Sequence, residues 1–517
     1  MTDAEKVNFH FDLWTQPWIG LEKLDGEFVR LGIEDTLLGS HEFRGFFDPS
    51  PLVVVGIHRL LTAILQDIFS PESEEELKQL WTMQQLSAEM LTTFQTNYGD
   101  RFDLFSQKAP FFQSMDTSST PAKGENIKSA AYLFHDIPSG TEHTHYRHGV
   151  QTDQIFCPVC VAAGMVTLPA FSTSGGKGIK PSINGVPPTY VIPCGKNLLE
   201  SLLLSLVLPG YQPQMRSVDL DLAWWKREPL IPRSSEVVKV GYLHSLTFQP
   251  RRVRLYPEKF MGPCSRCGET ISWGVREMIF DMGESRPKEA PPWFDPFAAY
   301  KTSEKKPPIP IRPVEGKAAW REYSNLFLKG KKEVQVLRPS FLDQIAELRE
   351  VDTGSISFRC VGMRTDMKAK IFEWVDTGFE VPGNLLRDED AGYIIDKGIR
   401  YAGDCASTMA SVFRKKFGGP GKDAARYAQL KTAMMDDYWK QLAIPFRRFV
   451  TETALVKGSE EPRKEWIDLV TNIAKRCFSK AAAAIGEDGK QLHERFSGER
   501  LCHNILLSAR KKELNYE

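Results

Sequence analysis

The chain has 517 residues, of which 42% are hydrophobic and eleven are tryptophan, and this composition is typical of two or more folded domains. Its 66 lysines and arginines balance 66 aspartates and glutamates. A net charge of zero argues against a protein that coats nucleic acid by bulk charge, although it permits local basic patches. We find no secretory signal in the first residues and no apolar run of about 18 residues, so we expect a cytoplasmic protein with no membrane partner.

The first quarter of the sequence predicts a hairpin followed by helices. Trp14 to Val29 is typical of a short hairpin around Asp25-Gly26, since these residues tolerate a tight turn. Pro51 follows Ser50 as a helix start, and the apolar run after it predicts a buried core helix. A second, amphipathic helix is expected over residues 74–98.

The middle of the chain, from Gly99 to about Val381, is rich in glycine, proline, serine and threonine and predicts strands and loops. We expect a strand over Val237–Phe248. A basic group follows it, which indicates either phosphate contacts or solvated surface; its members are Arg251, Arg252 and Arg254.

Two CxxC pairs, Cys157 with Cys160 and Cys264 with Cys267, are the most specific chemical signal. Four thiolates are a complete ligand set for a tetrahedral structural Zn²⁺, with no position left for water or substrate. The long gap between the pairs would make this metal a clip that closes a large loop. Two disulfides, or four unrelated buried thiols, are the alternatives. Nine cysteines in all favour a reducing compartment.

After Val381 the pattern becomes helical. Short glycine-containing breaks between long amphipathic stretches predict antiparallel neighbours and therefore a four-helix bundle. The expected helices are Asp388–Phe417, Lys422–Lys457, Pro462–Ile485 and Lys490–Leu514. Pro445 should kink or split the second helix. The predicted fold class is α+β, with a large mixed domain over 1–382 that carries the four-cysteine zinc site and a C-terminal four-helix bundle over 383–517.

The order of these features resembles a known family. The aromatic segments Phe102–Gln113 and Tyr242–Leu255, the two CxxC pairs and the C-terminal bundle are similar to the large subunit of the type I-E CRISPR Cascade complex, the CasA/Cse family. The resemblance implies a protein of antiviral defence with no catalytic role. Its implied partners are the other Cascade subunits, the 5′ handle of the guide RNA, double-stranded target DNA and a helicase-nuclease. Such a subunit recognises the protospacer-adjacent motif and starts strand separation.

A glycine-rich segment after the first CxxC pair has the chemistry of a nucleic-acid loop. Its glycines let the backbone approach a groove or a phosphate, and its lysines add charge. The candidate DNA-binding residues are Ser174, Gly175, Gly176, Lys177, Gly178 and Lys180. In the family, a loop at this position enters the minor groove of the motif duplex. A turn between strands is the alternative, and the order of a nucleotide-binding P-loop is absent.

Three further candidates depend on the resemblance. A wedge hairpin that unstacks DNA corresponds here to Met367 and Lys368, where the family often has glutamine. A cation after the second CxxC pair corresponds to Arg286 or Lys288. A loop that meets the RNA handle is histidine-rich here, and it could also bind a transition metal; its candidates are His145, Tyr146 and Arg147.

Other function classes remain open from the residues alone. No HExxH, GxSxG or dinucleotide fingerprint occurs in the sequence, which is why we do not expect an enzyme. The alternatives are a zinc-containing nucleic-acid-modifying enzyme or RNA-binding protein outside CRISPR, and a purely structural assembly subunit. Turnover of DNA or RNA would identify the enzyme, whereas motif-dependent duplex binding with guide-loaded partners would identify the Cascade subunit.

Overall fold

The computed structural model describes residues 9–115, 126–135, 154–174, 179–213, 221–228, 235–237, 239–303, 306–314, 317–329, 336–348, 354–365, 371–418, 424–456, 459–486 and 489–515. The chain forms two compact units. The first unit comprises Met1–Pro313, Pro339–Glu350 and Ile356–Glu380, and the second comprises Val314–Arg338, Val351–Ser355 and Val381–Glu517. The second unit therefore includes segments, such as Val314–Arg338, that precede the boundary predicted at 382/383. Independent folding on either side of that boundary stays a prediction.

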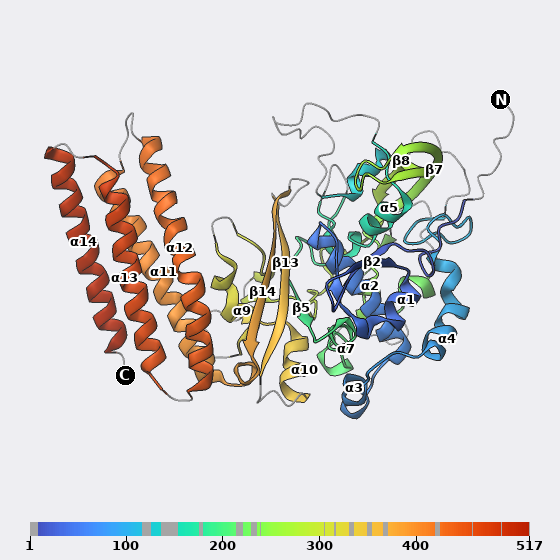
Figure 1. The fold of residues 1–517 in the computed structure, drawn as a ribbon, viewed down its shortest axis with the longest axis horizontal. Coiled ribbons are helices and arrows are strands. Elements are labelled where there is room, and N and C mark those ends of the chain that lie inside the picture. Colours follow the sequence, from blue (N-terminus) through green and yellow to red (C-terminus); the bar gives the residue numbers. More distant parts are fainter. Residues whose placement is uncertain are drawn as a thin grey trace. The chain divides into compact units, whose positions relative to one another are not determined.

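The first unit mixes helices with small sheets (Figure 1). Its helices are α1 (Ile33–Leu38), α2 (Pro51–Phe69), α3 (Glu74–Trp81), α4 (Ala88–Tyr98), α5 (Pro158–Met165), α6 (Leu168–Phe171), α7 (Leu198–Leu203), α8 (Tyr242–Leu246) and α10 (Ser340–Leu348). Its strands are β1 (Ile19–Lys23), β2 (Phe28–Leu31), β3 (Phe43–Phe46), β4 (Ile127–Ser129), β5 (Tyr190–Cys194), β6 (Ser235–Glu236), β7 (Arg251–Pro263), β8 (Thr270–Met282), β9 (Glu284–Ser285), β10 (Tyr300–Ser303) and β11 (Lys306–Pro310), with most of β13 (Ser355–Thr365) and β14 (Ile371–Pro382).

Four of these sheets organise the first unit. The antiparallel orders are β2-β1-β3, β4-β8-β7 and β14-β13-β5, and β6 pairs with β9 in parallel. The predicted N-terminal hairpin is confirmed, because β1 and β2 pair around Gly26, whose φ is +92°. The α+β fold class predicted from the sequence is also confirmed.

The core of the first unit is built around α2. This helix begins at Pro51 as predicted, and its residues from Pro51 to Gln66 are all buried. Among the described helices only α2 is long and apolar enough to cross a membrane, yet 83% of that window is buried inside the protein. The expectation that the chain has no apolar run of about 18 residues was therefore wrong, because α2 is such a run. The prediction that this helix is a buried core helix is confirmed.

Two local predictions in the first unit were wrong. The helix expected over 74–98 is two helices, α3 and α4, because the segment between Trp81 and Ala88 leaves the helical conformation. A capping box at Ser73 starts α3. The strand expected over Val237–Phe248 contains the short helix α8 instead, and the long strand β7 begins only at Arg251.

The second unit is dominated by four long helices, as predicted (Figure 1). They are α11 (Glu389–Phe417), α12 (Ala424–Leu455), α13 (Glu461–Ala483) and α14 (Gly489–Leu514). The short elements α9 (Tyr323–Phe327) and β12 (Val336–Leu337) also belong to this unit. Pro445 lies inside α12, which continues through it, so the helix is not split there, and the alternative of a kink stays a prediction.

Aromatic side chains fill the interior of the helical unit. Trp466 stacks on Phe449 with centroids 5.1 Å apart and donates its indole N–H to the carbonyl of Gly398 at 2.9 Å. A Cβ at Gly398 would lie 2.6 Å from the ring of Phe449, so glycine allows these helices to approach closely. Trp320 packs against Phe446 at 4.6 Å, which fastens the segment 314–338 to the helices.

Candidate metal centre and nucleic-acid interface

The four predicted metal ligands meet at one point. Cys157 is the N-cap of α5, and Cys160 lies one turn into that helix. Cys264 and Cys267 lie in the turn between β7 and β8, which Gly268 completes with a φ of +78°. The long antiparallel pairing of β7 with β8 carries this second pair to the first.

The spacing of the four sulfurs fits a tetrahedral ion. All four Sγ atoms lie within 4.8 Å of one another, and two pairs, Cys157–Cys267 and Cys160–Cys264, are 3.8 Å apart. A zinc–sulfur bond of about 2.3 Å places the corners of a tetrahedron about 3.8 Å apart. These distances are far longer than a disulfide bond of about 2.05 Å, and all nine cysteines are free. The cluster can therefore hold a metal ion, and the disulfide alternative was wrong.

Backbone contacts support the sulfurs. The amide of Cys157 donates to Sγ of Cys264 at 3.2 Å, and that of Cys160 donates to Sγ of Cys157 at 3.3 Å. Hydrogen bonds with neighbouring thiols raise the pKa of Cys160 and lower that of Cys264. Backbone N–H donors such as those of Cys157 and Cys160 orient and stabilise thiolate ligands.

The glycine-rich segment has its two ends fixed by one buried arginine. The guanidinium of Arg251 donates from Nη2 to the carbonyl of Thr173 and from Nη1 to the carbonyl of Lys180, the latter at 2.8 Å. Farther from the segment along the chain, the amide of Ser182 donates to the carbonyl of Ser172 at 2.9 Å. The residues on either side of the segment are therefore held to one another and to Arg251.

A small platform of two parallel strands lies beside this point. Nζ of Lys180 pairs with Glu236 of β6 at 3.1 Å, and Glu236 stands opposite Ser285 of β9. Arg286 follows Ser285 directly and is half-buried, whereas Lys288 is exposed. The structure thus brings Lys180, at the end of the glycine-rich segment, next to the strand from which Arg286 and Lys288 continue.

A buried carboxylate holds this platform in place. Glu284 accepts hydrogen bonds from the amide of Gln249 at 2.8 Å and from Arg227, and its Oε1 lies 3.0 Å from Nε2 of His244. Burial opposes the charge of Glu284, but Arg227 and His244 outweigh it and lower its pKa to about 2. The adjacent Gly283 is confined as well, since a Cβ there would lie 2.3 Å from the carbonyl oxygen of Gln249.

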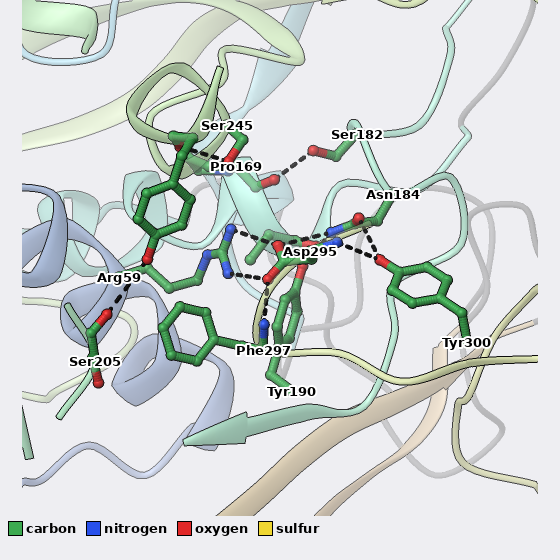
Figure 2. Close-up of polar contacts among 12 residues, drawn as sticks. Arg59, Pro169, Ser182, Asn184, Tyr190, Ser205, Ser245, Asp295, Phe297 and Tyr300 are labelled. Atoms are coloured by element: carbon green, nitrogen blue, oxygen red, sulfur yellow. Dashed lines mark hydrogen bonds and ion pairs between the residues drawn. The ribbon is translucent and has the colours of Figure 1, made fainter. Parts of the chain in front are cut away.

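A second polar network, shown in Figure 2, includes residues that precede and follow the glycine-rich segment in the sequence. Arg59 of α2 donates to both carboxylate oxygens of Asp295, at 3.2 and 2.9 Å. Asn184 joins this pair to Tyr300 and Tyr190 through hydrogen bonds of 3.1 and 3.0 Å. Tyr190 in turn donates to the carbonyl of Ala170 in α6 at 3.1 Å. Both sides of the segment are thereby connected to the core helix.

The comparisons with known proteins agree with this architecture. The family model of the CRISPR-associated protein Cse1 matches residues 12–477. The chain belongs to the Cse1 family. A curated relative, the CRISPR-associated protein CasA/Cse1 of Thermus thermophilus, is 26% identical over 96% of this chain and 97% of its own length. The family predicted from the sequence is confirmed.

Solved Cse1-family structures have the same fold. Cse1 from Acidimicrobium ferrooxidans superposes with a TM-score of 0.79 at 23% identity and covers 98% of this chain and 99% of its own. A chain from a structure described as a CRISPR RNA-guided surveillance complex gives a TM-score of 0.74 at 18% identity, covering 96% of this chain and 99% of its own.

Several predicted contact residues of this Cse1-family chain lie outside the described residues: Gly175, Gly176, Lys177, Gly178, His145, Tyr146, Arg147, Met367 and Lys368. Ser174, at the edge of the glycine-rich segment, is described and half-buried. These nucleic-acid contacts stay predictions.

The basic group at the start of β7 has a different role from the one expected. Arg251, Arg252 and Arg254 are 4%, 4% and 7% exposed. The interpretation of these residues as a phosphate-binding or solvated surface was therefore wrong, because the strand directs them into the protein. Sequence reasoning also missed Arg59 and Asp295. The signal was a charged residue inside an otherwise apolar helix, since a buried charge requires a partner.

Proposed function

We propose that this Cse1-family chain is the non-catalytic large subunit of a type I-E CRISPR RNA-guided surveillance complex. In this role it recognises the protospacer-adjacent motif of double-stranded DNA through the minor groove and helps to start strand separation and R-loop formation. It then recruits the helicase-nuclease that degrades the target. The family match over residues 12–477 and the similarity to a chain of a surveillance complex support this proposal.

The observation that carries motif recognition is the anchoring of the glycine-rich segment. Two buried networks fix its ends, and Lys180 stands exposed at one of them. The minor groove is narrow, so a backbone with little side-chain bulk can approach base edges that a bulky loop cannot. A rigid mount holds the ends of such a backbone, and contacts of neighbouring cations such as Lys180 and Lys288 with phosphates fix its register and orientation on the duplex.

The remaining partners and the cofactor belong to the same proposal. His145, Tyr146 and Arg147 contact the 5′ handle of the guide RNA, and Met367 with Lys368 wedge between base pairs. Other Cascade subunits surround the chain in the cytoplasm. The ion at the four cysteines is Zn²⁺, and its closed set of thiolate ligands makes it a scaffold for the β7–β8 turn.

The testing experiment uses the complex reconstituted with guide RNA and the other subunits. We expect duplexes with one motif to be enriched from a randomised motif library and neither DNA nor RNA to be cleaved by the complex alone. Gly176→Asp should abolish that enrichment because a charged side chain clashes in the groove, while guide-RNA assembly survives. Replacement of Met367 and Lys368 by glycine should leave initial binding intact but slow strand opening, measured with a fluorescent base beside the motif.

Two outcomes would contradict the proposal. Normal motif discrimination by Gly176→Asp would show that this segment does not read the motif. Turnover of nucleic acid by the purified chain would favour the enzyme alternative instead.

A further inference from the structure

Arg251 is a buried cation with an unusual set of partners. The residue is 4% exposed, and its guanidinium donates hydrogen bonds to three carbonyl oxygens, those of Lys180, Pro250 and Thr173. No carboxylate pairs with it among the residues that the structure describes. Burial accordingly lowers its pKa to about 10, with no opposing charge to raise it. A buried guanidinium with no countercharge costs stability, which requires a local explanation.

The geometry of the guanidinium supplies that explanation. Its planar fork directs Nη1 and Nη2 at two carbonyls that lie on opposite sides of the glycine-rich segment. The aromatic ring of Phe280 lies 5.7 Å from Cζ and supports the guanidinium from β8. An ammonium group or an amide cannot reach both carbonyls in this arrangement, because neither has two parallel donors on a side chain of this length.

Lys180 is the exposed residue that this contact fixes. Its carbonyl accepts from Arg251, its amide donates to Sδ of Met282 at 3.2 Å, and its side chain pairs with Glu236 at 3.1 Å. The backbone of Lys180 is thus held from two directions while its ammonium group stays at the surface. Of these contacts, only that with Arg251 also ties Lys180 to Thr173.

We propose that Arg251 is a positioning residue for motif recognition: it sets the separation of Thr173 and Lys180 and so presents Lys180 to the DNA without touching DNA itself. This inference rests on the proposed function. If Arg251 has this role, its replacement should weaken recognition of the motif more than it lowers the stability of the fold. Loss of the fork should disturb the two ends of the segment more than it disturbs the fold, because removal of an uncompensated buried charge offsets part of the lost hydrogen bonding.

The first test needs no nucleic acid. Hydrogen exchange in the full chain is compared for the wild type, Arg251→Met and Arg251→Lys. We expect faster exchange at the amides of Lys180 and Ser182 in Arg251→Met, a smaller increase in Arg251→Lys, and an unchanged thermal midpoint. Arg463→Met is the control for loss of a buried arginine elsewhere, since Arg463 of the helical unit donates to the carbonyl of Glu513 at 2.8 Å, although it also pairs with the carboxylates of Glu460 and Glu513. It should leave Lys180 and Ser182 unaffected.

The second test measures recognition in the reconstituted complex. Arg251→Met should lower the ratio of motif to non-motif duplex affinity by about tenfold, comparable to the loss of one specific base-pair contact. Arg251→Lys should restore part of that ratio, and Arg463→Met should retain all of it. Non-motif binding should stay within about twofold of wild type, since Lys180 keeps its charge.

The outcomes separate the inference from the proposed function. Faster exchange in Arg251→Met combined with an unchanged motif ratio would overturn the positioning role while motif recognition stands. Unchanged exchange would overturn it as well. A wild-type complex with no motif preference would instead overturn the proposed function, and the role of Arg251 in recognition with it, although the exchange result would still report the structural contact.

Discussion

The two units of the molecule solve the same packing problem in different ways. In the first unit, fully buried charges join segments that are far apart in the sequence, as in the pairing of Arg59 with Asp295. In the helical unit, aromatic side chains such as Trp320, Phe446 and Trp466 fill the interior. Helices satisfy most of their own backbone hydrogen bonds, whereas buried backbone groups of irregular segments require partners elsewhere in the protein. In these two examples a polar bridge joins an irregular segment to a helix, and aromatic packing joins helices.

Metal removal should break this comparison most strongly, because the four-cysteine cluster that we propose as the zinc site lies in the first unit. We expect Cys157→Ser, or treatment with a strong chelator, to forfeit a large share of the roughly 10 kcal/mol that a structural zinc contributes to folding. Elemental analysis should find one zinc per chain. Urea unfolding should show an early transition for the first unit, while the helical signal persists to higher urea.

Cys194→Ser is the control for the loss of a thiol, because Cys194 is half-buried and lies outside the cluster. It should unfold like the wild type. Protein that contains no zinc after gentle purification would contradict the zinc assignment.

The buried ion pair gives the next largest effect. Asp295→Asn leaves the guanidinium of Arg59 buried without a countercharge, and removal of one partner of a buried pair costs about 3–5 kcal/mol. The double variant Arg59→Met with Asp295→Leu should cost less than Asp295→Asn alone, since neither charge remains. The denaturant midpoint of the first transition measures the stability of both variants. Equal losses of stability in the two variants would show that the unpaired charge of Arg59 does not account for the cost of Asp295→Asn.

Removal of one aromatic side chain tests the role of aromatic packing in the helical unit. Trp320 is buried and packs against Trp439, Phe446 and Trp466. Trp320→Ala should lower the stability of that unit by about 3–5 kcal/mol through lost burial and a residual cavity. The second unfolding transition should shift, and the first should not. A fragment of Asn384–Glu517 should be helical by circular dichroism but less stable than the unit that includes Trp320.

The sequence predicted these two units unequally, for a physical reason. Helix boundaries in the second unit were correct to within about two residues, because amphipathic period and glycine breaks are local signals. The four cysteines were also found, since their chemistry is specific even across a long gap. Arg251 and Asp295 were not found in their roles, because what a charged residue touches after folding depends on contacts between distant segments that no local pattern encodes.

Acid should weaken the first unit through Glu284. Although its burial opposes ionisation, the charge of Arg227 and the contact with His244 lower its pKa from 4.5 to about 2 in the folded state. A depressed pKa stabilises the fold fully above the unfolded value, and this stabilisation is lost as the pH falls from about 4.5 towards 2. This shift corresponds to about 3 kcal/mol at neutral pH.

Glu284→Gln should remove that part of the pH dependence. Burial also lowers the pKa of His58 to about 3, so a second acid-sensitive contribution between pH 6.5 and 3 is expected in both proteins and cancels in their difference. The stability difference between wild type and Glu284→Gln should therefore shrink as the pH falls from about 4.5 towards 2, in measurements that run from about pH 7 to pH 2. Parallel curves would contradict a charged Glu284 in the folded state.

The smallest expected effect concerns Lys177, which extends the comparison from folding to binding. If the glycine-rich segment reads the motif by its backbone and the buried networks only hold its ends, then Lys177 adds charge without specificity. Lys177→Ala should weaken duplex binding about equally for motif and non-motif DNA and reduce the slope of log affinity against log salt by about 1, the value for one phosphate contact. Titrations of the reconstituted complex at several salt concentrations measure this slope. A selective loss of motif binding would instead show that the side chain of Lys177 reads bases, and recognition would then depend on more than a well-anchored backbone.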